Sequence, residues 1–182
     1  MAIRRVVLTV VCLFVALAAA QPALAHPLGN FTINHLVKVA VGRGDVRLRY
    51  VLDMAEIPTF QVMRSRDASG VMTPAELRAW SRDEIEAVAP DLKVFADGNG
   101  VELQASTPTV TTRRGAGGLP TLYWVEDFRS AMPRSIRTLT VHDATFPDRI
   151  GWKDVVVAPA TEPTDELTHY PNALLGSPRN LT

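Results

Sequence analysis

Residues 31–54 read FTINHLVKVAVGRGDVRLRYVLDM, and this stretch decides the fold. On each side of the central GRGD, apolar side chains fall on alternate positions, with His35 as the polar exception. A period of two is typical of strands that bury one face, and a glycine-rich tetrapeptide favours a tight turn. The stretch therefore predicts two strands joined by a turn at Gly42-Arg43-Gly44-Asp45.

The chain up to residue 158 repeats these strand signals. Asp97-Gly98-Asn99-Gly100 is a strong hairpin turn signal. Because several short strands separated by turns are typical of sandwiches, we expect a mainly β fold with a β-sandwich-like arrangement. Short apolar runs predict the further strands at 92–96, 101–104, 107–112, 119–128, 135–141 and 153–158.

One segment departs from the strand pattern. Thr73-Pro74-Ala75-Glu76 has the composition of a capping box with proline at the first helical position, and apolar residues follow at helical spacing. We expect a helix over 74–88 and a shorter one over 57–64. Together they predict one helix-loop-helix insertion near 57–88 within the β-sandwich domain.

The amino terminus has the three parts of a secretory signal peptide. Arg4 and Arg5 precede an apolar run over 6–20, and the small-residue triplet Ala23-Leu24-Ala25 follows. The run is shorter than the roughly 20 residues that a membrane-spanning helix needs. We therefore expect cleavage after Ala25 and export to the periplasm or the extracytoplasmic face of the cytoplasmic membrane.

This processing sets the domain organisation. Residues 1–25 are the expected signal peptide, 26–158 the β-sandwich domain, and 159–182 an extended linker. The only cysteine, Cys12, would leave with the signal, so no disulfide is expected. The signal holds two of the 19 basic residues and no acidic ones, which leaves 17 basic and 19 acidic residues. That near-neutral balance argues against nucleic acid as a partner.

Four stretches together resemble one protein family: HPLGNFTINH from His26, YVLDMAEIP from Tyr50, DATFPDRIGW from Asp143 and ELTHYPNALLGSP from Glu166. They are similar to the extracytoplasmic amino-terminal domain of bacterial nickel/cobalt transporters of the NicO type. In that family a bundle of membrane helices follows the domain and carries the transport residues. The resemblance implies a membrane permease domain, in the same or a neighbouring gene, as a partner and a divalent metal ion as a ligand. Because the sequence ends at Thr182, where the linker would enter that bundle, no transport residue can be carried over.

Cleavage after Ala25 would create a possible metal chelate at His26. Its α-amino nitrogen and its imidazole could bind one ion, and His35 on the core face of the first strand is the candidate second ligand. Such nitrogen ligands suit nickel, cobalt or copper. The alternative is that His26 is only the small polar residue after the cleavage site and that His35 is a hydrogen-bonded residue at the edge of the core.

Residues 65–76 match the outline of a calcium-binding EF-hand loop, with glycine at position 6 and glutamate at position 12. Serine at positions 1 and 5 leaves only two carboxylates, so we expect a calcium affinity far below that of an intact loop. The alternative is that the threonine and the glutamate only cap the second helix. The candidate ligands are Ser65, Asp67, Ser69, Thr73 and Glu76.

Two further features lie near the ends of predicted strands. Asp53 and Glu56 could supply oxygen ligands or an acid/base pair, although a solvated strand end before Pro58 is the alternative. The segment 113–118 is basic and glycine-rich, which is typical of a mobile loop, and we assign it no function.

No metalloprotease, nucleophile-elbow or phosphate-loop motif is present, so we do not expect an enzyme. Two functions remain open. One is the extracytoplasmic domain of, or a companion to, a nickel/cobalt transporter that captures or senses a divalent metal ion. The other is a free periplasmic or secreted β-sandwich interaction module with no metal role.

Overall fold

The computed structural model describes residues 29–157 of the chain. The expected signal peptide, His26 and the expected linker lie outside the described residues. Within residues 29–157, no helix is both long enough and apolar enough to cross a lipid bilayer.

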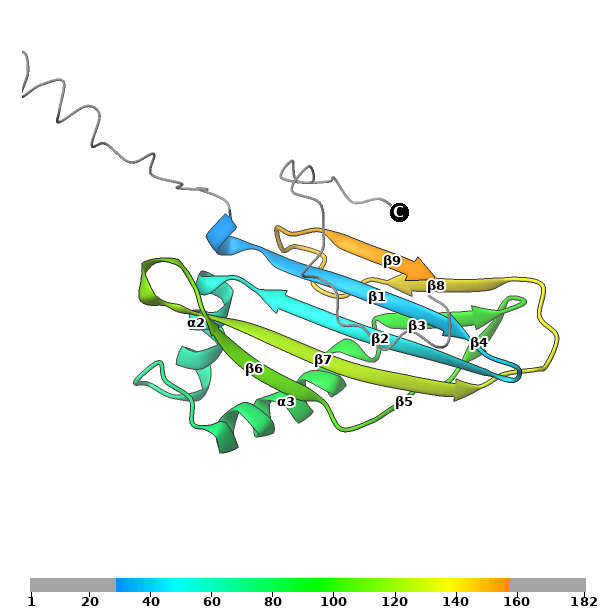
Figure 1. Cartoon of the computed structure of the whole chain (residues 1–182), viewed down its shortest axis with the longest axis horizontal. Coiled ribbons are helices and arrows are strands. Elements are labelled where there is room, and N and C mark those ends of the chain that lie inside the picture. The colour runs from blue at the N-terminus through cyan, green and yellow to red at the C-terminus, as the bar shows by residue number, and fades with distance from the viewer. Residues whose placement is uncertain (1–28, 158–182) are drawn as a thin grey trace, which may run out of the picture.

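The hairpin predicted from residues 31–54 is confirmed as the centre of a six-stranded sheet (Figure 1). Strand β1 (Ile33–Val41) pairs antiparallel with β2 (Asp45–Met54), and Val41 lies opposite Val46 at the turn. The sheet order is β5-β7-β2-β1-β9, with β6 also paired to β7. The other strands are β5 (Gln104–Ala105), β6 (Thr109–Arg114), β7 (Pro120–Ala131) and β9 (Lys153–Val157).

A second sheet of three strands has the order β4-β3-β8. Its strands are β3 (Leu92–Ala96), β4 (Asn99–Val101) and β8 (Leu139–Asp143). The hairpin predicted at 97–100 joins β3 to β4, and Asp97 and Gly98 both adopt positive φ, of 48° and 82°. Two successive positive φ values are typical of the tight turns that follow the twist of a hairpin.

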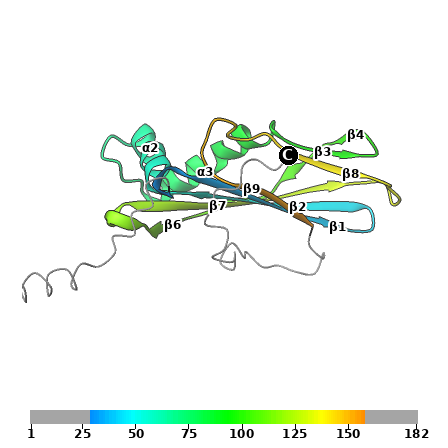
Figure 2. The ribbon, with the colours of Figure 1, turned by 90° about the horizontal axis from the view of Figure 1, so that it is seen from above.

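The predicted helical insertion lies between β2 and β3. Helix α2 spans Glu56–Arg66 and α3 spans Pro74–Val88. The capping box at the start of α3 is confirmed, because the Thr73 side chain accepts from the Glu76 backbone while the Glu76 side chain accepts from the Thr73 backbone. Figure 2 shows both helices and the small sheet on the same side of the large sheet. The chain is therefore mainly β, with two sheets and a helix-loop-helix insertion, in agreement with the expected fold class.

Some strand boundaries differ from those predicted. The segment 101–104 is not one strand, because β4 ends at Val101 in the small sheet and β5 begins at Gln104 in the large one. The strand predicted over 135–141 begins only at Leu139. The backbone amides of Arg137 and Thr138 donate instead to the carboxylate of Asp97, which removes them from a strand ladder.

The main core fills the space between the large sheet and the layer of helices and small sheet. Trp124 of β7 is fully buried there, and its indole nitrogen donates to the hydroxyl of Ser81 on α3 at 2.9 Å. A buried indole N–H usually has such a partner, because an unpaired one would lose a hydrogen bond to water. A smaller apolar cluster lies on the opposite face of the sheet and contains Leu36, Val51, Tyr123 and Val125, with Trp152 and Val156 packed against it.

Strand β9 is the last strand of the described chain, and it pairs parallel to β1. Just before β9, the backbone at Gly151 lies directly against β1, since a Cβ at Gly151 would overlap the carbonyl oxygen of Ile33. Backbone hydrogen bonds hold the segment on both sides, from Ile33 N to Ile150 O at 2.8 Å and from His35 N to Trp152 O at 2.9 Å.

Gly151→Ala is expected to lower the free energy of unfolding by about 3 kcal/mol, because the added methyl group forces β9 away from β1. Urea unfolding followed by tryptophan fluorescence measures the change. Gly100→Ala is the matched control, since a Cβ there would meet no described atom within 4 Å. Equal unfolding midpoints for the two variants would contradict the close approach.

Candidate functional site

A cleft of about 450 Å³ lies at the end of the large sheet where β1 begins and β2 ends. It brings together five segments that are separated along the chain: the short 3-10 helix η1 (Gly29–Phe31), β1, the junction of β2 with α2, the end of β6, and the start of β7. Its polar and charged lining consists of Asn30, Thr32, Asn34, Asp53, Glu56, Arg113, Arg114 and Thr121.

The strand alternation explains why polar side chains meet here. Asn34 lies opposite Asp53 in the β1–β2 ladder, and Arg113 lies opposite Thr121 in the β6–β7 ladder. Neighbouring positions in an antiparallel pair direct their side chains to the same face, which here is the face away from the helices. Asn34, Asp53, Arg113 and Thr121 thus line the cleft from outward-facing strand positions, and Glu56 joins them from the start of α2.

Asp53 is the half-buried carboxylate at the centre of this set. Burial raises the pKa of Asp53, the nearby Arg113 guanidinium opposes that shift, and the negative charge of Glu56 adds to it. The charged neighbours that affect this carboxylate, Arg113 and Glu56, line the same cleft.

Glu56 begins α2 directly after β2 and is buried, with 7% of its surface exposed. Its carboxylate packs against the loop that follows β6, since a Cβ at Gly115 would lie 2.5 Å from Glu56 Oε1. Only glycine allows the backbone to approach this closely. The two acidic residues singled out in the sequence, Asp53 and Glu56, therefore do line one cleft.

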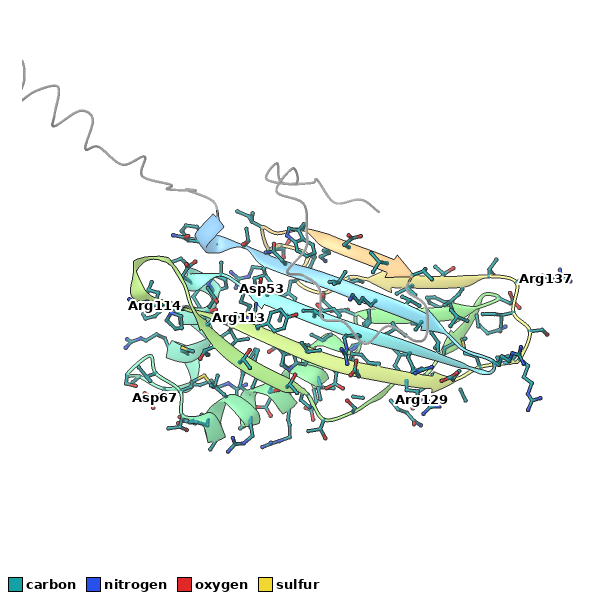
Figure 3. The ribbon with its side chains drawn as sticks, viewed as in Figure 1. Asp53, Asp67, Arg113, Arg114, Arg129 and Arg137 are labelled. Carbon is teal, nitrogen blue, oxygen red and sulfur yellow. The ribbon has the colours of Figure 1, made fainter. Side chains whose placement is uncertain are left out.

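The basic side chains of the cleft come from the glycine-rich segment to which the sequence gave no role. Arg113 and Arg114 are the last two residues of β6, so this part of the segment is strand. The Arg113 guanidinium carbon lies 3.9 Å from the centroid of the Tyr123 ring, a cation–π contact that fixes its position. Figure 3 shows Asp53, Arg113 and Arg114 at one end of the sheet, with Arg129 and Arg137 at the other.

His35, the expected second ligand for His26, lies on the opposite face of β1 from the cleft. It is 1% exposed, and its Nδ1 lies 3.1 Å from Tyr50 Oη, 3.0 Å from Thr145 Oγ1 and 3.3 Å from Asp143 Oδ2. This geometry agrees with the alternative that His35 is a hydrogen-bonded residue of the fold. Its ring, however, lies inside the core and not at the core's edge. His142, by contrast, is exposed on β8.

The predicted calcium loop connects α2 to α3. Ser65 lies in the last turn of α2 and donates to Val62 O, and the Asp67 carboxylate accepts from Ser69 N at 2.6 Å. The hydrogen bonds with Ser69 hold the pKa of Asp67 below its ordinary value. Thr73 and Glu76 form the capping box described above.

A calcium ion in this loop would compete with those hydrogen bonds for both carboxylates. Across residues 29–157, no three histidine, cysteine, aspartate or glutamate side chains gather into a group that could hold a metal ion. The calcium site and the His26 chelate stay predictions.

Glu126 is a buried carboxyl group that the sequence did not single out. Its Oε1 accepts from the backbone and the hydroxyl of Ser106, whereas Oε2 has no partner within the described part of the chain. Burial raises the pKa of Glu126, and the Ser106 hydrogen bonds oppose that shift only in part. Glu126 lies outside the cleft and holds the chain between β5 and β6 against β7.

Comparison of the chain with protein-family models, curated proteins and solved structures found no match.

The buried contact between His35 and Asp143 makes the stability of the fold depend on pH in acid. Burial alone would raise the pKa of Asp143, but hydrogen bonds from His35 and Thr145 outweigh it and hold that pKa below its ordinary value. A lowered carboxyl pKa stabilises the fold at pH values above about 4, and this contribution is lost as the pH falls through the folded-state pKa.

Asp143→Asn is expected to lower the free energy of unfolding by about 2 kcal/mol at pH 7, with a smaller loss near pH 3. Urea titrations at a series of pH values measure this dependence. The exposed Asp148 provides the control variant Asp148→Asn. A loss of stability that does not change between pH 7 and pH 3 would contradict the role given to the ionised Asp143.

Proposed function

We propose that this chain is the extracytoplasmic domain of, or a companion to, a nickel/cobalt transporter, and that it captures a divalent metal ion outside the cytoplasmic membrane. The membrane permease domain is its partner, and the metal ion is cargo. The proposal rests on the sequence resemblance and on the placement of the cleft.

The single observation that carries the proposal is the position of Asp53 and Glu56 beside Gly29. Both carboxylates line the cleft together with Gly29, which is the first described residue. His26 lies three positions earlier, and three residues of extended chain span roughly 10 Å. Three residues of chain are long enough to bring the nitrogen ligands of a processed His26 to the cleft that Gly29 lines.

This ligand set has the chemistry of a transition-metal site. An amino-terminal nitrogen and an imidazole supply the nitrogen donors that nickel and cobalt favour, and Asp53 supplies a carboxylate oxygen. The half-buried position of Asp53 also reduces competition from water. In this arrangement the ligands are His26 and Asp53, while His35 supports the core beneath them.

A second candidate function has one specific observation in its favour. Arg113 and Arg114 place two positive charges in the same cleft, which oppose a bare cation and suit a partner with anionic groups. A free interaction module without a metal role would use the cleft in this way.

Isothermal titration of the mature protein with nickel, cobalt and copper ions distinguishes the two functions. His26→Ala, Asp53→Asn and the addition of one residue before His26 are each expected to weaken binding of the preferred ion about tenfold or more, or about 1.4 kcal/mol. Each change removes a ligand or disrupts the amino-terminal chelate.

The matched controls are Asp91→Asn and His142→Ala, which change exposed residues outside the cleft. Both are expected to bind metal as the parent protein does. The same dissociation constant for all six proteins, or no measurable binding by the parent, would reject metal capture in the cleft.

A further inference from the structure

The outward face of the large sheet carries a band of apolar side chains. Leu36 lies opposite Val51 in the β1–β2 ladder, and Val51 lies opposite Val125 in the β2–β7 ladder. Together with Tyr123 they form the smaller apolar cluster, and we call these four residues the outer band. Figure 2 shows both helices and the small sheet on the other side of the large sheet. Among residues 29–157, no helix or second sheet therefore lies over the outer band.

The composition and burial of the outer band are those of a covered face. The solvated face of an antiparallel sheet normally carries polar side chains at alternate positions of each strand. Here Leu36 and Val51 are each only 1% exposed, and Trp152 and Val156 pack against the band. Shielding of this degree is typical of packed layers. The band is therefore suited to a partner that presents apolar side chains to a sheet face.

We propose that the segment 167–175 of the same chain, which reads LTHYPNALL, packs on the outer band. Strand β9 ends at Val157, directly after Val156, so the chain leaves the described domain beside the band. Leu174 follows Val157 by 17 positions (174 − 157). An extended chain of that length spans roughly 56 Å, whereas four neighbouring strands are only about 15 Å across. The segment is thus long enough to reach every part of the band.

The sequence of this segment suits a sheet face better than a strand edge. Its large apolar residues are Leu167, Tyr170, Leu174 and Leu175, and the stretch before them is polar and rich in proline. Pro171 has no backbone N–H to donate, which makes the segment a poor additional strand beside β9. Apolar side chains that pack on the face of the sheet need no such ladder.

Covalent attachment favours this occupant over a second copy of the chain. A tethered segment has a roughly millimolar effective concentration next to its own domain, whereas a second copy has only its concentration in solution. The inference does not rest on the proposed function, because this packing needs no metal ion. It does place the segment beside the cleft, since Arg113 of the cleft lies over the ring of Tyr123 in the band.

The test is methyl NMR of the full mature protein with labelled leucine and valine methyl groups. We expect nuclear Overhauser effects between Leu174 or Leu175 and Leu36 or Val51, because packed methyl groups lie in van der Waals contact. A mixture of labelled and unlabelled protein distinguishes contacts within one chain from contacts between two. Contacts only between chains would assign the band to a second copy and overturn the inference. The absence of any contact from residues 167–175 would overturn it as well.

Acrylamide quenching of tryptophan fluorescence gives a second measurement. Of the three tryptophans, Trp80 and Trp124 are buried in the main core, so Trp152 beside the band is the one that acrylamide reaches most easily. The double change Leu174→Ser and Leu175→Ser is expected to raise the quenching constant at least about twofold. The reason is that loss of two buried leucine side chains releases the segment from the band.

Leu181→Ser is the matched control, since it makes the same change outside 167–175. Its quenching constant is expected to equal that of the parent protein. The thermal midpoint of each variant is measured to show that the domain stays folded. Equal quenching constants for the parent, the double variant and the control would overturn the inference. No metal is added in either experiment, so failure here leaves metal capture in the cleft to its own titration.

Discussion

The fold depends on the buried hydrogen-bond network around His35. His35 and Tyr50 come from adjacent strands of the large sheet, whereas Asp143 ends β8 of the small sheet and Thr145 follows it. Tyr50 Oη lies 2.7 Å from Thr145 Oγ1, and the His35 ring contacts Phe146 edge-on with centroids 5.2 Å apart. Polar groups this deeply buried are costly without partners, so the network permits only one arrangement of the two layers.

The same two-residue period that directs His35 inward directs its neighbour Asn34 outward. Asn34 and Asp53 then lie side by side on the outer face, and the turn from β2 into α2 adds Glu56. Core and cleft are therefore two sides of one set of strands. A one-residue slip of β1 would exchange the faces and lose both at once, which strongly specifies the register.

Local signals made much of this fold predictable from the sequence. The 31–54 hairpin, the turn at Asp97-Gly98 and the capping box at Thr73 each depend on residues close together in the chain, and all three are confirmed. The pairing of strands into two sheets and the placement of Arg113 in the same cleft as Asp53 depend on contacts between distant segments, which periodicity does not encode. The acidic pair of the cleft was recognisable because both members flank one strand end, whereas its basic pair belonged to a segment that looked like a loop.

The parallel pairing of β9 with β1 affects how the chain reaches its native state. The hydrogen bond between Trp152 and Asn34 joins positions 118 apart in the sequence. Closing such a large loop is entropically demanding, and pairings of this kind tend to form late. One edge of the β1–β2 hairpin thus stays uncovered during synthesis until nearly the whole domain has emerged. Completion of the large sheet therefore waits for the last strand of the described chain.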